Sequence, residues 1–129
     1  MALNQPTPIH LRQLKCHMLD ISAANSPAYV AVPWKCKIIR LGVILHGPIS
    51  GADSVVTCSV VSAGVAVAIT GGTITAANAS SAAGSEFSAS PTAITHALEG
   101  DAIGFVSDGA SSTTASATCY ALVDLTGDN

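Results

Sequence analysis

Apolar and polar residues alternate along short segments through most of this chain, and this pattern restricts the fold more than any other feature of the sequence. Within residues 37–45 the odd-numbered positions Ile39, Leu41, Val43 and Leu45 are all apolar. Successive side chains of a β-strand point to opposite faces, so a period of two is typical of a strand with one buried face. The same period recurs in 54–61, 65–69, 102–106 and 117–125.

Short runs rich in glycine, serine and aspartate separate these segments, as at Gly47-Pro48, Gly71-Gly72 and Asp108-Gly109. Such turns are too short to contain crossover helices, so neighbouring strands are expected to run antiparallel, as in a β-sandwich or barrel. We therefore predict an all-β fold. The alternation predicts a core that contains Leu41, Val43, Val56, Val60, Val67, Ile103, Phe105, Ala121 and Val123.

The N-terminal segment fits two patterns. Helical spacing links Leu11, Leu14 and Met18, whereas one face of a strand would contain Leu11, Leu19 and Ile21. Because the segment runs into a polar turn without a glycine stop, we favour a strand over about residues 10–21.

The length and composition indicate one domain with a core of small side chains. We predict a single domain over residues 10–129, preceded by a short extended arm over residues 1–9. Hydrophobic residues make up 49% of the chain, but most are alanine and valine, and aromatic residues account for 4%. A buried valine or leucine contributes about 1.5–3 kcal/mol to stability, and a buried alanine much less. A core of small side chains therefore gives the folded chain only a small stability. Because self-association would add to that stability, we expect a homo-oligomer.

Charged residues are unevenly placed along the chain. All five bases lie within the first 40 residues with one acid, Asp20, whereas the acids from Asp53 onwards have no base near them in the sequence. This asymmetry predicts that one end of the domain meets an acidic surface. Nucleic acid is a poor partner, since the few bases are not interleaved with aromatic residues. The bases are Arg12, Lys15, Lys35, Lys37 and Arg40.

No membrane segment or secretory signal is expected. Polar and proline residues interrupt residues 1–15, where a signal peptide would need a continuous apolar run. The apolar stretch from Val55 to Ile69 is too short and too polar to span a bilayer. We therefore expect synthesis and folding in a cytoplasm.

The four cysteines and four histidines do not form a recognisable metal motif. Cys16 and His17 are adjacent, so on a strand they would point to opposite faces. Cys36, Cys58 and Cys119 show no paired spacing typical of zinc ligands. We predict four reduced, mostly buried thiols, with a disulfide or a metal site as the alternatives.

The sequence contains no motif of a catalytic site. A Gly-x-Ser-x-Gly turn and a glycine-rich phosphate loop are both absent, so we expect neither an enzyme nor a cofactor. Few aromatic residues are available to stack on sugars. Trp34, between Pro33 and Lys35, would be either an exposed anchor for a partner or a plug at one end of the fold.

The order of several short segments resembles that of a known class of proteins. These segments are Asp20–Ser22, Ala28–Pro33, Lys37–Arg40, Gly51–Asp53, Gly84, Glu99–Ile103 and Ser107–Ser111. Together they resemble small virion proteins of tailed bacteriophages, the jelly-roll decoration or cement proteins of the outer capsid face. With the alternation, the resemblance predicts a jelly-roll-like antiparallel β-sandwich.

This resemblance also implies a function. Such a protein would be made in the host cytoplasm, would bind the virion exterior, and would cement neighbouring copies of the major capsid protein as a homo-oligomer, a trimer rather than a dimer. The alternative is a receptor- or carbohydrate-binding tip domain of a tail fibre. On the first interpretation the arm and the basic segment face the capsid, through Arg12, Lys15, Trp34, Lys35, Lys37 and Arg40.

Overall fold

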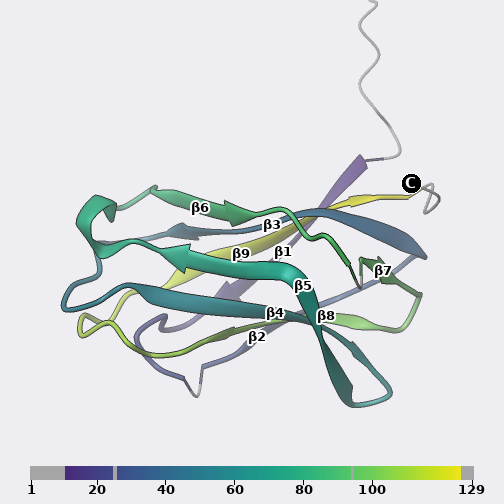
Figure 1. Cartoon of the computed structure of the whole chain (residues 1–129), viewed down its shortest axis with the longest axis horizontal. Coiled ribbons are helices and arrows are strands. Elements are labelled where there is room, and N and C mark those ends of the chain that lie inside the picture. The colour runs from purple at the N-terminus through teal and green to yellow at the C-terminus, as the bar shows by residue number, and fades with distance from the viewer. Residues whose placement is uncertain (1–10, 25, 94, 126–129) are drawn as a thin grey trace, which may run out of the picture.

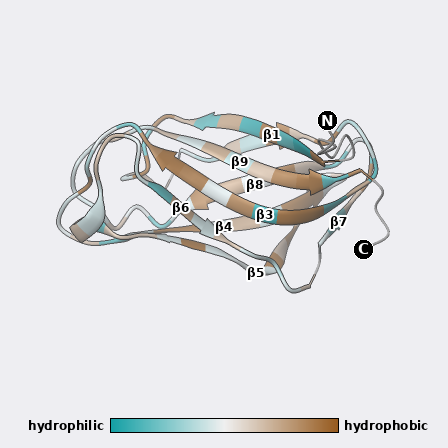
Figure 2. Ribbon diagram, turned by 90° about the horizontal axis from the view of Figure 1, so that it is seen from above, coloured by the Kyte–Doolittle hydropathy of each residue, from teal (hydrophilic) through white to brown (hydrophobic). Residues whose placement is uncertain are grey.

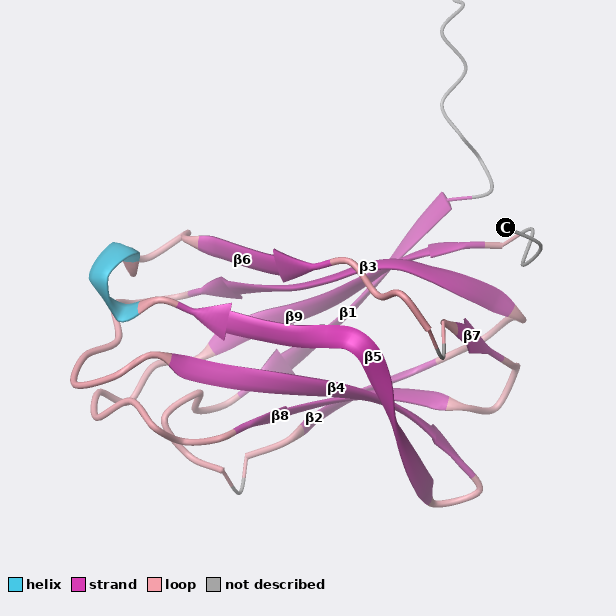
Figure 3. Cartoon of the chain, viewed as in Figure 1, coloured by secondary structure: helices cyan, strands magenta, loops and turns pink. Residues whose placement is uncertain are grey.

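The computed structural model describes residues 11–24, 26–93 and 95–125, and the predicted arm over residues 1–9 lies outside them. The described residues form two antiparallel sheets packed face to face, as predicted (Figures 1 and 3). The first sheet has the order β1-β9-β3-β6, with β7 also paired to β3: β1 (Leu11–Met18), β9 (Ala117–Asp124), β3 (Cys36–Leu45), β6 (Glu86–Ala89) and β7 (His96–Ala97). The second sheet has the order β2-β8-β4-β5: β2 (Ala28–Ala31), β8 (Ala102–Ser107), β4 (Ser54–Ser62) and β5 (Val65–Ala76). The described helical structure is a single 3-10 turn over Asn78–Ser80, drawn in cyan in Figure 3.

The core lies between the inner faces of the two sheets. Of the predicted core residues, all but Val67 are buried. Sheets packed in this way bury alternate residues of every strand, which is why a period of two in the sequence located most of the core. Val67 is the exception.

Val67 was predicted to be buried, and this was wrong, because β5 bends. Thr57 of β4 pairs with Thr73, but Ser59 pairs with Ala68, so β5 contains extra residues between these pairs. The bend lies at Gly71, whose φ of 78° is in the left-handed region. Beyond it the β4–β5 hairpin projects away from the sandwich (Figure 1). Val67 therefore remains 47% exposed although it lies opposite Val60.

A second irregularity lies in β3. Ile38 pairs with Val123 and Arg40 with Leu122, so Ile39 is an extra residue in the ladder. Such a bulge reverses the alternation on one side of it. Ile38 is consequently buried and Ile39 is 37% exposed, the reverse of the predicted pattern at these two positions.

The N-terminal segment is a strand, as favoured, but it ends earlier than predicted. β1 stops at Met18, which is fully buried. Leu19, expected on the buried face, is 74% exposed, whereas Ile21 is buried in the turn that follows. β1 is an edge strand that pairs with β9 alone.

Candidate interaction surface

The two sheets differ in charge. All charged residues within the described strands belong to the first sheet, and the described strands of the second sheet contain none (Figure 2 shows the hydrophilic colouring of β1 and β6). We call the outer face of the first sheet the charged face and that of the second the uncharged face. The strand residues that carry charge are Arg12, Lys15, Lys37, Arg40, Glu86 and Asp124.

The strand register gathers three of the predicted contact residues on the charged face. Lys37 lies opposite Asp124, Arg40 opposite Leu122, and Lys15 opposite Tyr120. The residues between these on β9 point into the core, so these pairs point outward. Sequence-distant bases are thus brought onto one surface because β9 pairs with both β1 and β3.

Two acids share this face, which the sequence pattern did not predict. Glu86 lies on β6 opposite Ile44, and Asp124 lies at the end of β9 and is 6% exposed. The basic segment is therefore not a separate end of the domain. The charged face instead alternates bases with acids.

Tyr120 is buried although its side chain lies on the outer face. Its ring covers Gly42, its hydroxyl donates a hydrogen bond to Glu86 Oε2, and Arg40 also hydrogen-bonds to it. Burial and the Glu86 carboxylate raise the pKa of Tyr120, and the Arg40 charge partly offsets this. The phenol therefore stays protonated and fixes Glu86 and Arg40 in place.

Gly42→Ala is expected to disturb this arrangement. A Cβ at this position would overlap Cε2 and Cζ of the Tyr120 ring, so the ring must move. We expect a loss of about 1–3 kcal/mol in the free energy of unfolding, measured in urea. Gly47→Ala is the matched control, since a Cβ there meets nothing within 4 Å. Equal stabilities of the two variants would contradict the tight contact.

The remaining predicted contact residues lie beside or behind the charged face. Trp34 is 45% exposed in the loop between β2 and β3, so it is not a plug, and Lys35 next to it is also exposed. Hydrogen bonds from Val32 N to Asp101 O (2.9 Å) and from Gly100 N to Val32 O (3.1 Å) hold this loop. Arg12 pairs with the buried Val123, so its side chain leaves β1 on the side away from the charged face.

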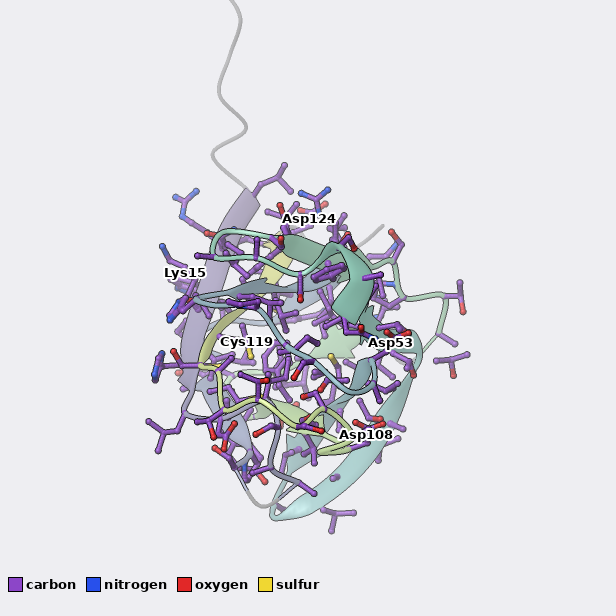
Figure 4. All side chains as sticks on the ribbon, turned by 90° about the vertical axis from the view of Figure 1, so that its left-hand side faces the viewer. Lys15, Asp53, Asp108, Cys119 and Asp124 are labelled. Atoms are coloured by element: carbon purple, nitrogen blue, oxygen red, sulfur yellow. The ribbon has the colours of Figure 1, made fainter. Side chains whose placement is uncertain are left out.

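The acidic side chains at the loop end of the sandwich hold the loops together (Figure 4). Asp53 Oδ1 accepts hydrogen bonds from Asn78 N (2.9 Å) and Nδ2 (2.8 Å). Asp108 Oδ1 accepts from Val55 N (3.1 Å) and Ala110 N (3.0 Å). One oxygen of each carboxylate is thus engaged within the chain, which favours a structural role for both.

His46 lies between two hydroxyl groups of β9 and the segment before it. Its Nδ1 and Nε2 lie 2.8 Å from the hydroxyls of Ser116 and Thr118, and its ring stacks on His17 at 5.5 Å between centroids. A serine nucleophile and its histidine base are normally oriented by a third, usually acidic, group. Here a second hydroxyl occupies that position.

Residues 11–24, 26–93 and 95–125 form no pocket. In the same part of the chain, histidine, cysteine and acidic side chains form no group of three that could hold a metal ion. None of its helices has the length and apolar character to cross a membrane.

The four cysteines are free thiols in the structure. Burial raises the pKa of Cys36, and it raises that of Cys58 to about 12. Cys16 on β1 is partly exposed and lies opposite the buried Cys119 on β9. His17 follows Cys16 and stacks on His46 at the surface, so the two neighbours do point to opposite faces.

The chain is similar in structure to a known protein. No protein-family model matches the chain, and a search of curated proteins found no match. Among solved structures, the chain is similar to one from the cyanophage Pam1 capsid asymmetric unit. The two have 13% sequence identity and a TM-score of 0.48, and the similarity covers 97% of this chain and 91% of that chain.

Proposed function

We propose that the protein is a structural virion protein that binds the outer surface of a tailed-phage capsid and cements neighbouring major capsid subunits. The contrast between the two outer faces supports this proposal most directly. A domain that lies between a charged lattice and further copies of itself needs one face for each contact. The order of the short sequence segments, which resembles that of phage decoration proteins, favours the same role.

The charged face and the adjoining Trp34 loop form the proposed capsid contact. Lys15, Lys35 and Arg40 lie on or beside this surface and are exposed, so they can steer association with acidic groups of the capsid. Trp34 adds a large, half-exposed ring, the type of side chain that dominates binding energy when a partner covers it.

The uncharged face forms the proposed self-contact of a homo-oligomer, a trimer in preference to a dimer. Val106 and Thr57 are exposed partners on neighbouring strands, and the Tyr29 ring lies across Gly104. Covering this face removes apolar surface from water without desolvating a charge. The composition of the core gives an independent reason to expect association.

Binding to capsids tests the function. Purified protein is added to expanded shells that lack it, the shells are sedimented, and bound copies are counted per shell. Decoration predicts copies by the hundred over the shell, seen as a repeated density by cryo-EM. A few copies at the tail would support the tail-fibre tip instead and would overturn the proposal.

The arm over residues 1–9 is the remaining part of the proposed contact. Deleting it is expected to weaken attachment to shells while leaving the thermal midpoint of the sandwich unchanged, because the core lies in the described strands. Raised salt should slow the binding of the full chain, since screening weakens steering by exposed bases. If the deletion variant decorates shells as well as the full chain does, the arm is not part of the capsid contact.

A further inference from the structure

Three cysteines that are distant in the sequence lie on the inner faces of the two sheets. Cys16 on β1 and Cys119 on β9 are directly opposed partners in the first sheet, and their thiols share a hydrogen bond. Cys58 on β4 of the second sheet interacts electrostatically with both. Figure 4 shows Cys119 inside the fold. Neither the proposed capsid contact nor the proposed self-contact uses these groups.

The backbone geometry suits a disulfide between Cys16 and Cys119. Opposed residues of antiparallel strands have Cα atoms about 4.5–5.5 Å apart. A disulfide joins Cα atoms about 4.4–6.8 Å apart, so this pair can close without moving its strands. Facing sheets are about 10 Å apart, which makes Cys58 the poorer partner for either thiol.

The two thiols differ in a way that suits stepwise oxidation. Cys16 is the more accessible of the two, and the hydrogen bond from Cys119 lowers the pKa of Cys16. The same bond, together with burial, raises the pKa of Cys119. A soluble disulfide would therefore react first at Cys16, and Cys119 would then resolve the mixed disulfide.

We propose that Cys16 and Cys119 form a disulfide that staples the edge strand β1 to β9 once the protein leaves a reducing compartment. The oxidant is a small disulfide such as oxidised glutathione. The Cys16 thiolate attacks one of its sulfurs and releases the first glutathione thiol. Cys119 loses its proton and attacks the Cys16 sulfur, which releases the second. Two protein thiols are oxidised and one glutathione disulfide is reduced to two thiols.

The disulfide would act on an edge strand of the first sheet. β1 has one neighbour, and the bond would link it to a strand near the other end of the chain. Joining such distant positions restricts the unfolded chain over most of its length. The inference goes beyond the proposed function, which supplies only a reason for the protein to leave the cytoplasm.

The test uses the isolated full chain without capsids. Freshly reduced protein should show four thiols when titrated under denaturing conditions, and two after incubation of the folded protein with oxidised glutathione. Peptide mapping should find Cys16 joined to Cys119. The thermal midpoint should rise by roughly 10 °C and return on reduction. Cys36→Ala is the matched control, in which two thiols are still lost and the midpoint still rises.

Cys119→Ala should abolish both the intramolecular bond and the rise in midpoint, while Cys58→Ala should retain both. The inference is overturned if all four thiols persist after oxidation, if mapping finds Cys58 in the bond, or if Cys16 joins two chains together. None of these results depends on capsid binding. A failure here is thereby distinguishable from a failure of the proposed function.

Discussion

Val106→Lys is expected to dissociate the oligomer into monomers. Val106 lies on β8 opposite Thr57 in the uncharged face and is 39% exposed, so the fold itself tolerates a polar side chain there. In the assembled protein the new ammonium group would be buried without a partner charge. Such burial costs about 3 kcal/mol or more, which weakens association at least roughly 100-fold. Light scattering at micromolar concentration after size-exclusion chromatography measures the change.

Gln13→Lys is the matched control for this prediction. Gln13 is an exposed residue of β1 on the charged face, where it lies opposite Leu122. This variant adds the same charge to the other side of the sandwich and should remain oligomeric. If Val106→Lys remains oligomeric too, the uncharged face is not the self-contact. A monomeric wild-type protein at micromolar concentration would remove the oligomer from the proposal altogether.

The fold was predictable because the alternation of residues is a local signal. In β9 the alternate residues Ala117, Cys119, Ala121 and Val123 are all buried, and Tyr120 is the outward residue between them that is buried as well. The errors at Ile39 and Val67 both arise where a strand gains extra residues relative to its neighbour. Such bulges are set by pairing with distant strands, so no local pattern marks them.

The candidate surface was predictable in part for a related reason. The bases cluster in the sequence, and three of them do lie on one face. That Glu86 and Asp124 share this face follows from the pairing of β3 with β6 and β9, which is non-local. The opposition of Cys16 and Cys119 likewise depends on the register between β1 and β9. The absence of charged residues from the described strands of the second sheet does not depend on pairing. It was predictable, because each of these segments is free of charge in the sequence itself.

Trp34→Ala is expected to weaken attachment to capsids more than any other single truncation on the proposed contact. Because the ring is 45% exposed in the free protein, its removal should leave the free energy of unfolding nearly unchanged. A tryptophan that a partner covers completely contributes about 2–4 kcal/mol to binding, or roughly 30- to 700-fold in the dissociation constant. Titration of fluorescently labelled protein onto shells that lack it measures the change.

Leu19→Ala is the matched control for the attachment measured with Trp34→Ala. Leu19 is also a large apolar side chain and is 74% exposed. It follows the last residue of β1, whereas Leu11 is the first residue of that strand. The Trp34 loop leads into the start of β3, next to Lys37. In the first sheet Lys37 and Leu11 lie in the same row, on either side of Asp124, so Trp34 and Leu19 lie toward opposite ends of the sandwich. Loss of attachment in Trp34→Ala with normal attachment in Leu19→Ala would place the capsid contact at the Trp34 end of the sandwich. Equal attachment of both variants would leave exposed bases such as Lys15 as the groups that hold the capsid, and raised salt should then release the bound protein as well as slow its binding.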